Sequence, residues 1–478
     1  MEKQTIILVH GWSVTNTDTY GELPARLETE AKLGNAPEVD VRHIYLSKYI
    51  SFNDSVLLPD LAHAFEAALH RELPTLLNEG KKFIAITHST GGPVLRYWWQ
   101  TLYAKQERAC PMSHLIMLAP ANFGSALAQL GKSRLGRIAS WFNGVEPGTG
   151  VLDWLELGSE SSWQLNHDWI CSTTDPAKQN DPVFQFVLSG QTIDHKLYDH
   201  VNHYTAETGS DGVIRLASAN LNSQYICLAQ DKANQQLTVK QHQTSPATAF
   251  AIVPGVSHSG AEHGILRSIK KTHDNHPTVN LILACMIVKD AQSYEKIVNL
   301  FNAQNETIQQ LERVNVIESK TFPDRYMIQD QDSMIMFRLR DNYGHIINDY
   351  AIRLTAKDHS PSALAPGFFI DRQKNAKQNG ALTYYVNYDV MNGCPAIVYH
   401  DKAIRPELHS MQMFGLNVIA QPDNGLVHYQ PADLMANQNY LREFIKPNQT
   451  TMIDIVMNRV LESELFTLTT EQTPRSFK

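Results

Sequence analysis

KKFIAITHSTGGPVLRYWW, from Lys81 to Trp99, joins an apolar, β-branched run to a sharp polar corner and the start of a helix. The run favours a buried strand, and Pro93 suits the first helical turn, where its missing N–H would have no intrahelical partner. Ser89 stands between the two elements, with Gly91 on the helix side. A serine at such a strand-to-helix corner presents its hydroxyl above the sheet, which predicts a nucleophile.

The corner departs from the usual G-x-S-x-G pattern at one position. It reads Thr87-His88-Ser89-Thr90-Gly91, with threonine in place of the first glycine. Taken alone, it also fits a polar cap on an ordinary buried helix. The backbone N–H of Thr90, at the helix start, is the first candidate donor to an oxyanion.

The N-terminal strand predicts a second donor. Thr5 to Val9 is a buried-strand run that ends in His10-Gly11-Trp12, and a glycine lets the chain turn sharply there. We expect the N–H of Trp12 to point at the same oxygen as that of Thr90. Removing one donor of this kind costs about 10²–10³ in rate. A strand that simply ends at a glycine fits equally well.

A third strand, His114 to Leu118, runs into the turn APANFGS, Ala119 to Ser125. This turn resembles one in the lipase branch of the α/β-hydrolase superfamily. The resemblance continues through Gly148 to Ser159 and through Trp163 to Asn166. The chain as a whole also looks similar to bacterial lipase-type effectors. It implies a doubly wound, mostly parallel sheet over about the first 270 residues.

The same resemblance implies a lid or cap over the acyl site, in an insertion around residues 124–170. Between Ala126 and Asn143 apolar residues alternate with basic ones: Leu130, Lys132, Arg134, Leu135, Arg137, Ile138, Trp141 and Phe142. A segment of this kind could lie on an anionic lipid surface. A helix packed on the sheet, with a solvated basic face, fits the pattern as well.

Asp211 is the predicted acid of a catalytic triad. It lies in GSDGVI, Gly209 to Ile214, which resembles the turn that carries the acid in lipases. A carboxylate there can hold a histidine tautomer and stabilise its charged form. Aspartates also form ordinary Asp-Gly turns. Asp194 and Asp199 are weaker alternatives.

His258 is the predicted general base. It follows the last strand of the hydrolase pattern, Ala249 to Val253, and completes the chain order Ser…Asp…His that the hydrolase fold requires. His263 is the runner-up, because an insertion could move the catalytic position along this loop.

Composition sets limits on other functions. The 478 residues are 43% apolar, enough for a large core and two or more domains. A formal charge of −8 argues against nucleic-acid binding. Five separated cysteines indicate neither a zinc site nor a disulfide framework: Cys110, Cys171, Cys227, Cys285 and Cys394. We expect no cofactor and no metal.

No pattern typical of a targeting signal is found, so we expect synthesis in the cytoplasm. The apolar run at the N-terminus begins too early and is too short for a signal peptide. No apolar run approaches the roughly 20 residues that cross a bilayer, so any membrane contact is expected to be peripheral. Export by a specialised secretion machine and a cytosolic housekeeping role both remain open.

The pattern of apolar and polar residues changes between Lys271 and Asn280. This change predicts a catalytic domain over residues 1–275 and a second domain over residues 276–478. Val279 to Val288 favours a strand, and Asp290 to Val314 an amphipathic helix. From Ser333 onward, short alternating runs predict a β-rich, antiparallel sandwich.

The second domain is expected to dock on lipid or on a partner protein, by analogy alone. Four aromatic residues could anchor in headgroups, although core positions are the commoner explanation: Phe368, Phe369, Tyr384 and Tyr385. Three acidic residues could form a calcium loop, although turn formation explains them better: Asp341, Asp349 and Asp358.

The sequence therefore predicts an α/β-hydrolase that cleaves acyl esters of glycerolipids or phospholipids through an acyl-enzyme on Ser89. A soluble carboxylesterase for short acyl esters would share every predicted catalytic residue. A non-catalytic binding protein with the hydrolase fold is the other alternative, favoured only by Thr87.

Overall fold

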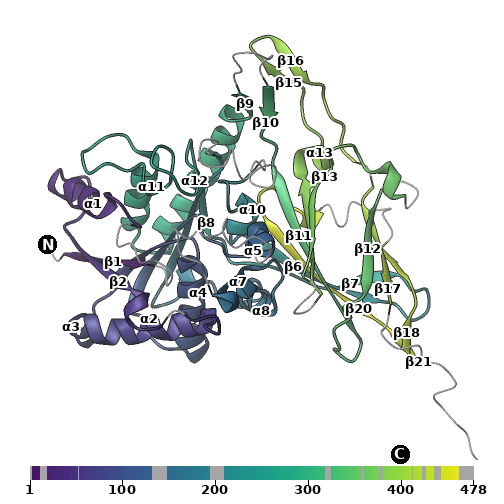
Figure 1. The fold of residues 1–478 in the computed structure, drawn as a ribbon, viewed down its shortest axis with the longest axis horizontal. Helices are drawn as coiled ribbons and strands as arrows, with labels where there is room; N and C mark the ends of the chain where they lie inside the picture. Colours follow the sequence, from purple (N-terminus) through teal and green to yellow (C-terminus); the bar gives the residue numbers. More distant parts are fainter. Residues whose placement is uncertain are drawn as a thin grey trace, which may run out of the picture.

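The computed structural model describes residues 3–10, 19–51, 53–131, 148–193, 209–317, 325–356, 360–375, 380–411, 413–421, 427–434 and 443–461. An α/β half and a β-rich half lie side by side (Figure 1). Within the described residues, no helix combines the length and the apolar character that a bilayer span needs.

The α/β half contains sheet A, six parallel strands in the order β2-β1-β3-β4-β5-β8. Both faces of a parallel sheet are covered, so its strands are nearly continuous apolar runs. In β3, for example, Phe83 and Ala85 join the core on one face and Ile84 and Ile86 the core on the other. The strands are β1 (Gln4–His10), β2 (Val39–Tyr45), β3 (Phe83–His88), β4 (Met112–Leu118), β5 (Phe184–Gly190) and β8 (Ala249–Val253).

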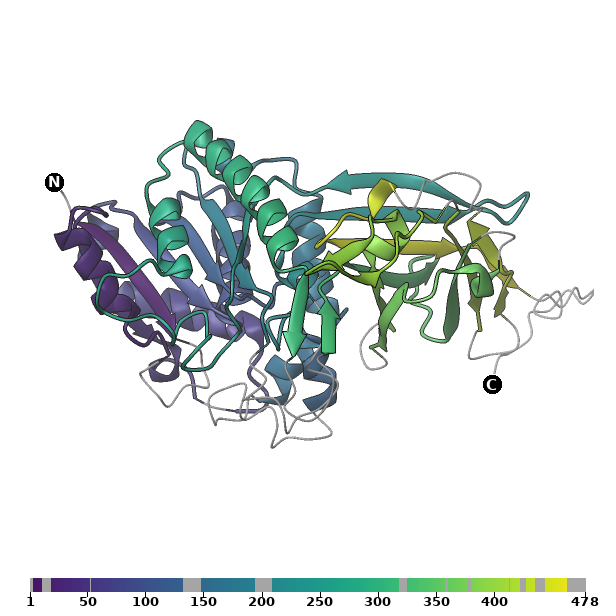
Figure 2. The ribbon, with the colours of Figure 1, turned by 90° about the horizontal axis from the view of Figure 1, so that it is seen from above.

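Helices cover both faces of sheet A. On one face lie α2 (Leu58–Glu72), α3 (Pro74–Asn78), α4 (Gly91–Leu102), α7 (Thr149–Leu155) and α8 (Glu160–Ile170). On the other lie α1 (Leu23–Lys32), α11 (Pro277–Met286) and α12 (Ala291–Leu311). Figure 2 shows α12 running obliquely across the sheet. This doubly wound arrangement confirms the predicted fold class.

The helix predicted over Asp290 to Val314 is confirmed as α12, which Asp290 caps by accepting the N–H of Ser293 at 2.8 Å. The strand predicted over Val279 to Val288 is wrong, because these residues form most of α11. Val279, Ile282 and Met286 recur at helical spacing and are buried toward sheet A. A short, continuously apolar run does not distinguish a strand from a buried helix.

The β-rich half is built on sheet C, six strands in the order β13-β14-β11-β20-β6-β7. Two neighbouring pairs, β11 with β20 and β20 with β6, are parallel, so the expected antiparallel sheet is in fact mixed. The strands are β6 (Ser223–Gln230), β7 (Leu237–Thr244), β11 (Asp332–Asp341), β13 (Phe369–Lys374), β14 (Leu382–Asn387) and β20 (Thr450–Met457).

Sheet C is the middle layer of the molecule. Met334 and Met336 of β11 join the core shared with α7 and α8, whereas Ile335 and Phe337 join a core shared with a third sheet. Alternate residues of a strand point to opposite faces, so one strand serves both cores. The third sheet contains β12 (Tyr350–Thr355), β17 (Gly415–Ala420) and β19 (Ala432–Leu434).

The packing does not follow the expected division at residue 275. The β6–β7 hairpin lies between β5 and β8 in the chain, yet it belongs to sheet C and extends into the β-rich half (Figure 2). Helices α11 and α12 follow residue 275, yet they cover sheet A. Each of these segments packs against the sheet that buries its apolar face, and that sheet is formed by residues distant in the sequence.

Smaller elements complete the β-rich half. The hairpins β9–β10 (Val314–Ile317, Arg325–Ile328) and β15–β16 (Ile397–Tyr399, Lys402–Arg405) lie together at one end of the molecule (Figure 1), with the rings of Tyr326 and Tyr399 5.9 Å apart. The β-rich half also contains α13 (Tyr388–Asn392), β18 (Val427–Tyr429), β21 (Arg459–Leu461) and a short 3₁₀ helix at Pro361–Ala363, and α10 (Leu216–Ala219) lies next to β5 and β11.

Candidate active site

Ser89 occupies the corner between β3 and α4, as the sequence predicts. Its backbone has φ 53°, in the left-handed region that residues other than glycine rarely adopt. The corner is held by a hydrogen bond from the Ser89 N–H to the Leu118 carbonyl at 3.0 Å, at the end of the neighbouring strand β4. Strain of this kind persists only where the surroundings fix it, and it recurs at nucleophile corners.

Thr87 and Gly91 explain how the corner tolerates its departure from the usual pattern. A Cβ placed on Gly91 would lie 3.2 Å from the Cβ of Thr87. Helix α4 can therefore pass close to strand β3 even with threonine at position 87, because position 91 is glycine. Gly92 is constrained too, since a Cβ there would lie 2.7 Å from the Cβ of Pro120.

The structure brings Ser89, His258 and Asp211 together although they are far apart in the chain. The Nε2 atom of His258 lies 3.2 Å from the Oγ of Ser89, and its Nδ1 lies 3.0 Å from an Oδ of Asp211. All three residues are buried: Ser89 is 8% exposed, His258 1% and Asp211 0%. At these distances the three side chains form a continuous hydrogen-bond chain from the Ser89 hydroxyl through the His258 imidazole to the Asp211 carboxylate.

The Asp211 carboxylate is oriented by its own loop. Its other oxygen accepts the backbone N–H groups of Val213 at 3.0 Å and Ile214 at 2.7 Å. The backbone N–H of His258 donates to the Asp211 carbonyl at 2.9 Å, so the two loops are also joined through the main chain. Because both carboxylate oxygens of Asp211 accept hydrogen bonds, its side chain is held in the rotamer that faces His258.

Other sequence candidates fall in different places. The ring of His263 is exposed and lies 3.9 Å from Glu262, whereas His258 makes the contacts with Ser89 and Asp211. The His263 carbonyl accepts the N–H of Ser257. Thr90 is the residue that precedes α4, next to Ser89. Trp12, Asp194 and Asp199 lie outside the described residues.

Only part of the expected lid region is described. Ala126–Gly131 forms helix α5, and residues 132–147 lie outside the described residues. Residues after 148 form α7 and α8, whose Trp154 and Trp163 are buried in the core between sheet A and sheet C. This part of the insertion is an interior layer.

His88 is a neighbour of the triad that the sequence analysis did not weigh. Its Nε2 lies 3.3 Å from the His258 carbonyl, and the two rings are 4.8 Å apart. Burial, together with the neighbouring His258, lowers the pKa of His88 to about 3. Its ring is therefore neutral near pH 7 and adds no positive charge beside His258.

Arg96, one turn into α4 beyond the corner, was also missed. Its guanidinium is fully buried and reaches Asn166 Oδ1 at 3.0 Å and Asn122 Oδ1 at 3.4 Å, and burial lowers its pKa to about 9. Asn122 in turn donates to the Ala219 carbonyl at 2.7 Å, beyond the Asp211 loop. The network ties the nucleophile helix to the short helix Leu216–Ala219 that follows the acid loop. Its sequence signal was the charged residue inside an apolar helix.

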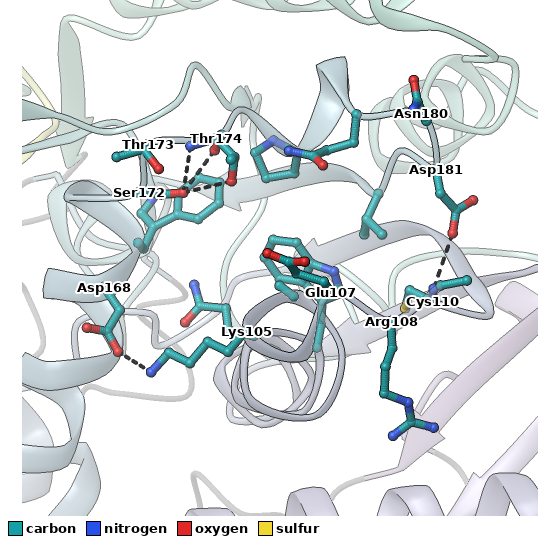
Figure 3. A pocket seen from close by; sticks show the side chains of 18 of the residues that line it. Lys105, Glu107, Arg108, Cys110, Asp168, Ser172, Thr173, Thr174, Asn180 and Asp181 are labelled. Carbon is teal, nitrogen blue, oxygen red and sulfur yellow. Dashed lines mark hydrogen bonds and ion pairs between the residues drawn. The ribbon is translucent and has the colours of Figure 1, made fainter.

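A pocket of about 740 Å³ opens at the opposite edge of sheet A (Figure 3). It is lined by residues at the end of α4, the end of α8 and the starts of β4 and β5, whereas Ser89 follows the carboxyl end of β3. Lys105 and Asp168 form an ion pair there. The pocket is therefore separate from the triad.

Metal ligation finds no support in the part of the chain that the structure describes, where no group of three His, Cys, Asp or Glu could hold an ion. Asp341, one of the three acidic residues considered for calcium, accepts the N–H groups of Tyr343 and His345 at 2.9 Å and so shapes a turn. Asp358 lies outside the described residues.

The fold and the hydrogen-bond chain together define a serine hydrolase of the lipase branch of the α/β-hydrolase superfamily. Comparison with known proteins narrows this class. No family model and no curated protein matches the chain. Among the solved structures that are similar to the chain over its full length are two of phospholipase PlaB from Legionella pneumophila.

One of these structures is a complex with thio-NAD, at 40% identity, and the other is at 42% identity. In each, the match covers 100% of this chain and 98% of the other, with a TM-score of 0.86. The chain therefore belongs to the same family as phospholipase PlaB.

Proposed function

We propose that this chain is a serine phospholipase that releases fatty acid from glycerophospholipids through Ser89, His258 and Asp211. The observation that carries the proposal is the buried hydrogen-bond chain Ser89–His258–Asp211, with distances of 3.2 and 3.0 Å. The full-length similarity to a protein described as a phospholipase supports phospholipid esters as the substrate class.

In this mechanism His258 Nε2 takes the proton of Ser89 as its Oγ attacks the ester carbonyl. The same nitrogen then protonates the leaving alcohol, so an acyl-enzyme on Ser89 remains. Water, activated by His258, cleaves that ester and releases the fatty acid. Asp211 holds the tautomer with hydrogen on Nδ1 and stabilises the imidazolium. No step involves oxidation or reduction, so we assign the thio-NAD of the PlaB complex no part in it.

The oxyanion that forms at each step needs preorganised donors. The N–H of Thr90, adjacent to Ser89 at the start of α4, is the donor we assign within the described residues. We keep the N–H of Trp12 as the proposed second donor. Because His88 is neutral, the N–H of Thr90 is the positive end of a dipole that faces the site from the start of α4.

Mass spectrometry of the products tests the proposal most directly. Wild-type protein and Ser89→Ala are mixed with phospholipid vesicles whose two acyl chains differ, and with a triglyceride emulsion. We expect fatty acid and lysolipid from the wild type, and turnover lower by about 10⁶ in Ser89→Ala with the fold retained. The chain that is released identifies the glycerol position.

Two outcomes would favour the alternatives. Hydrolysis that declines sharply beyond short acyl chains would identify a soluble carboxylesterase. Failure of a fluorophosphonate probe to label Ser89, with no release from any ester, would identify a binding protein that kept the hydrolase fold. Export to a membrane surface by a secretion machine is a further part of the proposal, and detection of the chain outside the producing cell tests it.

A further inference from the structure

A groove of about 670 Å³ runs along the open side of the β-rich half. It lies where two edge strands meet: β12 ends the three-stranded sheet and β13 ends sheet C. Tyr384 of β14 forms part of its lining and joins the two sheets, because its hydroxyl donates to the Ile352 carbonyl at 2.8 Å. The groove is therefore a fixed feature of the sandwich.

The aromatic lining of this groove includes one ring that is not buried. Phe369 is 47% exposed, whereas its neighbours Phe368 and Tyr384 are 0% and 4% exposed. The Phe369 ring lies 5.7 Å from that of Tyr384, so it is supported on one side and open on the other. Aromatic rings with one packed and one open face are favoured at membrane–water boundaries.

The two edge strands each bring an exposed arginine to the groove, Arg353 from β12 and Arg372 from β13. Among the residues that the structure describes, no carboxylate pairs with either guanidinium group. Asp371, also in the lining, keeps its negative charge, and its oxygens accept the backbone N–H of Arg372 at 2.7 Å and the side-chain amide of Gln373 at 3.0 Å. Two arginines and one aspartate give the lining a formal charge of +1, in a chain whose formal charge is −8.

We propose that this groove binds the phosphate headgroups of anionic phospholipids at a membrane surface, with Phe369 inserted beside the acyl chains. Guanidinium groups match phosphate through paired hydrogen bonds, and their attraction to an anionic leaflet adds to the contact. The inference deepens the proposed function and rests on it, since a phospholipase has to bind the surface that holds its substrate.

Binding to vesicles tests this groove without turnover. The full-length chain carrying Ser89→Ala is sedimented with vesicles of phosphatidylcholine, alone or with phosphatidylglycerol. The double variant Arg353→Gln/Arg372→Gln should bind the anionic vesicles about 30-fold more weakly, because each basic residue near such a surface contributes about 1 kcal/mol. Phe369→Ser should weaken binding to both kinds of vesicle. High salt should remove the arginine effect and leave the phenylalanine effect.

Matched controls come from the α/β half. Lys289→Gln/Lys296→Gln removes two exposed cations, and Leu300→Ser removes an apolar side chain that is 54% exposed on α12. Both should bind as the parent does. Binding by the groove variants equal to that of the parent would overturn the proposal. So would a change of oligomeric state in Phe369→Ser at unchanged vesicle binding, which would make the groove a contact between copies.

Hydrolysis of a soluble, monomeric short-chain ester separates this inference from the proposed function. In a chain with Ser89 intact, the groove variants should keep full activity on that ester and lose activity on anionic vesicles. If the wild type hydrolyses neither substrate, the proposed function fails. If the groove variants hydrolyse vesicles as the wild type does, only the groove assignment fails.

Discussion

The two halves of the molecule each contain an aspartate that is completely buried, and the two carboxylates have different surroundings. Asp211, beside sheet A, faces His258 and the backbone N–H groups of its own loop. Asp454, in the middle of sheet C, accepts from Arg338 at 2.8 and 2.9 Å, from Tyr225 at 2.8 Å and from Arg340. One carboxylate orients a reactive group, and the other joins strands β6, β11 and β20.

Because of this difference, the same substitution should have opposite consequences in the two halves. Of the substitutions that compare the two halves, Asp211→Asn should have the largest effect and lower kcat by about 10⁴, because the amide favours the wrong tautomer of His258. The midpoint of urea unfolding should change little, since an amide oxygen can still accept from Val213 and Ile214. Turnover of a soluble ester measures the effect, and a variant that keeps wild-type turnover would remove Asp211 from the triad.

Asp454→Asn is the matched change in sheet C, and we expect it to lower the free energy of unfolding by about 3 kcal/mol, because it leaves two arginines facing an uncharged group. Activity on a soluble ester should persist in the folded fraction. Tyr225→Phe removes a single hydrogen bond to Asp454 and should cost about 1 kcal/mol. Equal unfolding curves for Asp454→Asn and wild type would show that the cluster adds nothing to stability.

The two halves also differed in how far the sequence predicted them. Sheet A and its corner were predictable because most of its strands are short buried runs, and Ser89, Asp211 and His258 each come after a strand of this sheet in the chain. The edge strand β2 is only partly buried and was not predicted. The order of these residues along the chain carries the information that no single motif does. The structure adds the distances that bring the three side chains together.

Sheet C was not predictable in the same way. Tyr225 and Asp454 are 229 residues apart, and nothing in the local pattern of either strand indicates its partner. The hairpin β6–β7 looked like part of the hydrolase segment because it lies between two strands of sheet A. The sequence of helix α11 predicts a strand because its run is apolar on nearly every side, which hides the 3.6-residue period.

A buried histidine in sheet A makes the stability of the protein depend on pH. His114 on β4 is buried, with its Nε2 2.9 Å from the Val288 carbonyl just beyond α11, and burial lowers its pKa to about 4. The unfolded chain takes up a proton below about pH 6.5, whereas the folded chain does not until about pH 4. Stability is therefore lost as the pH falls through this window, by about 2 kcal/mol between pH 6.5 and pH 5.

Urea unfolding of the wild type and His114→Phe at pH 7 and pH 5 measures this contribution. The variant should be less stable at pH 7 and should lose about 2 kcal/mol less on acidification. Other buried histidines remain in both proteins and cancel in the difference. The same pH dependence in the two proteins would mean that His114 is not held neutral by the fold.

The smallest effect concerns the nucleophile corner and tests whether Thr87 and Gly91 share one space. Gly91→Ala places a Cβ 3.2 Å from the Cβ of Thr87, closer than ordinary contact, so strand and helix have to separate slightly. We expect a loss of about 1 kcal/mol in stability from this crowding. Thr87→Gly costs a similar amount alone, as glycine does inside a strand. The double variant should recover part of the sum, with a coupling energy of about 1 kcal/mol. Strictly additive losses would mean that the corner adjusts to each side chain independently, and that the threonine is tolerated for a reason other than the glycine two residues beyond Ser89.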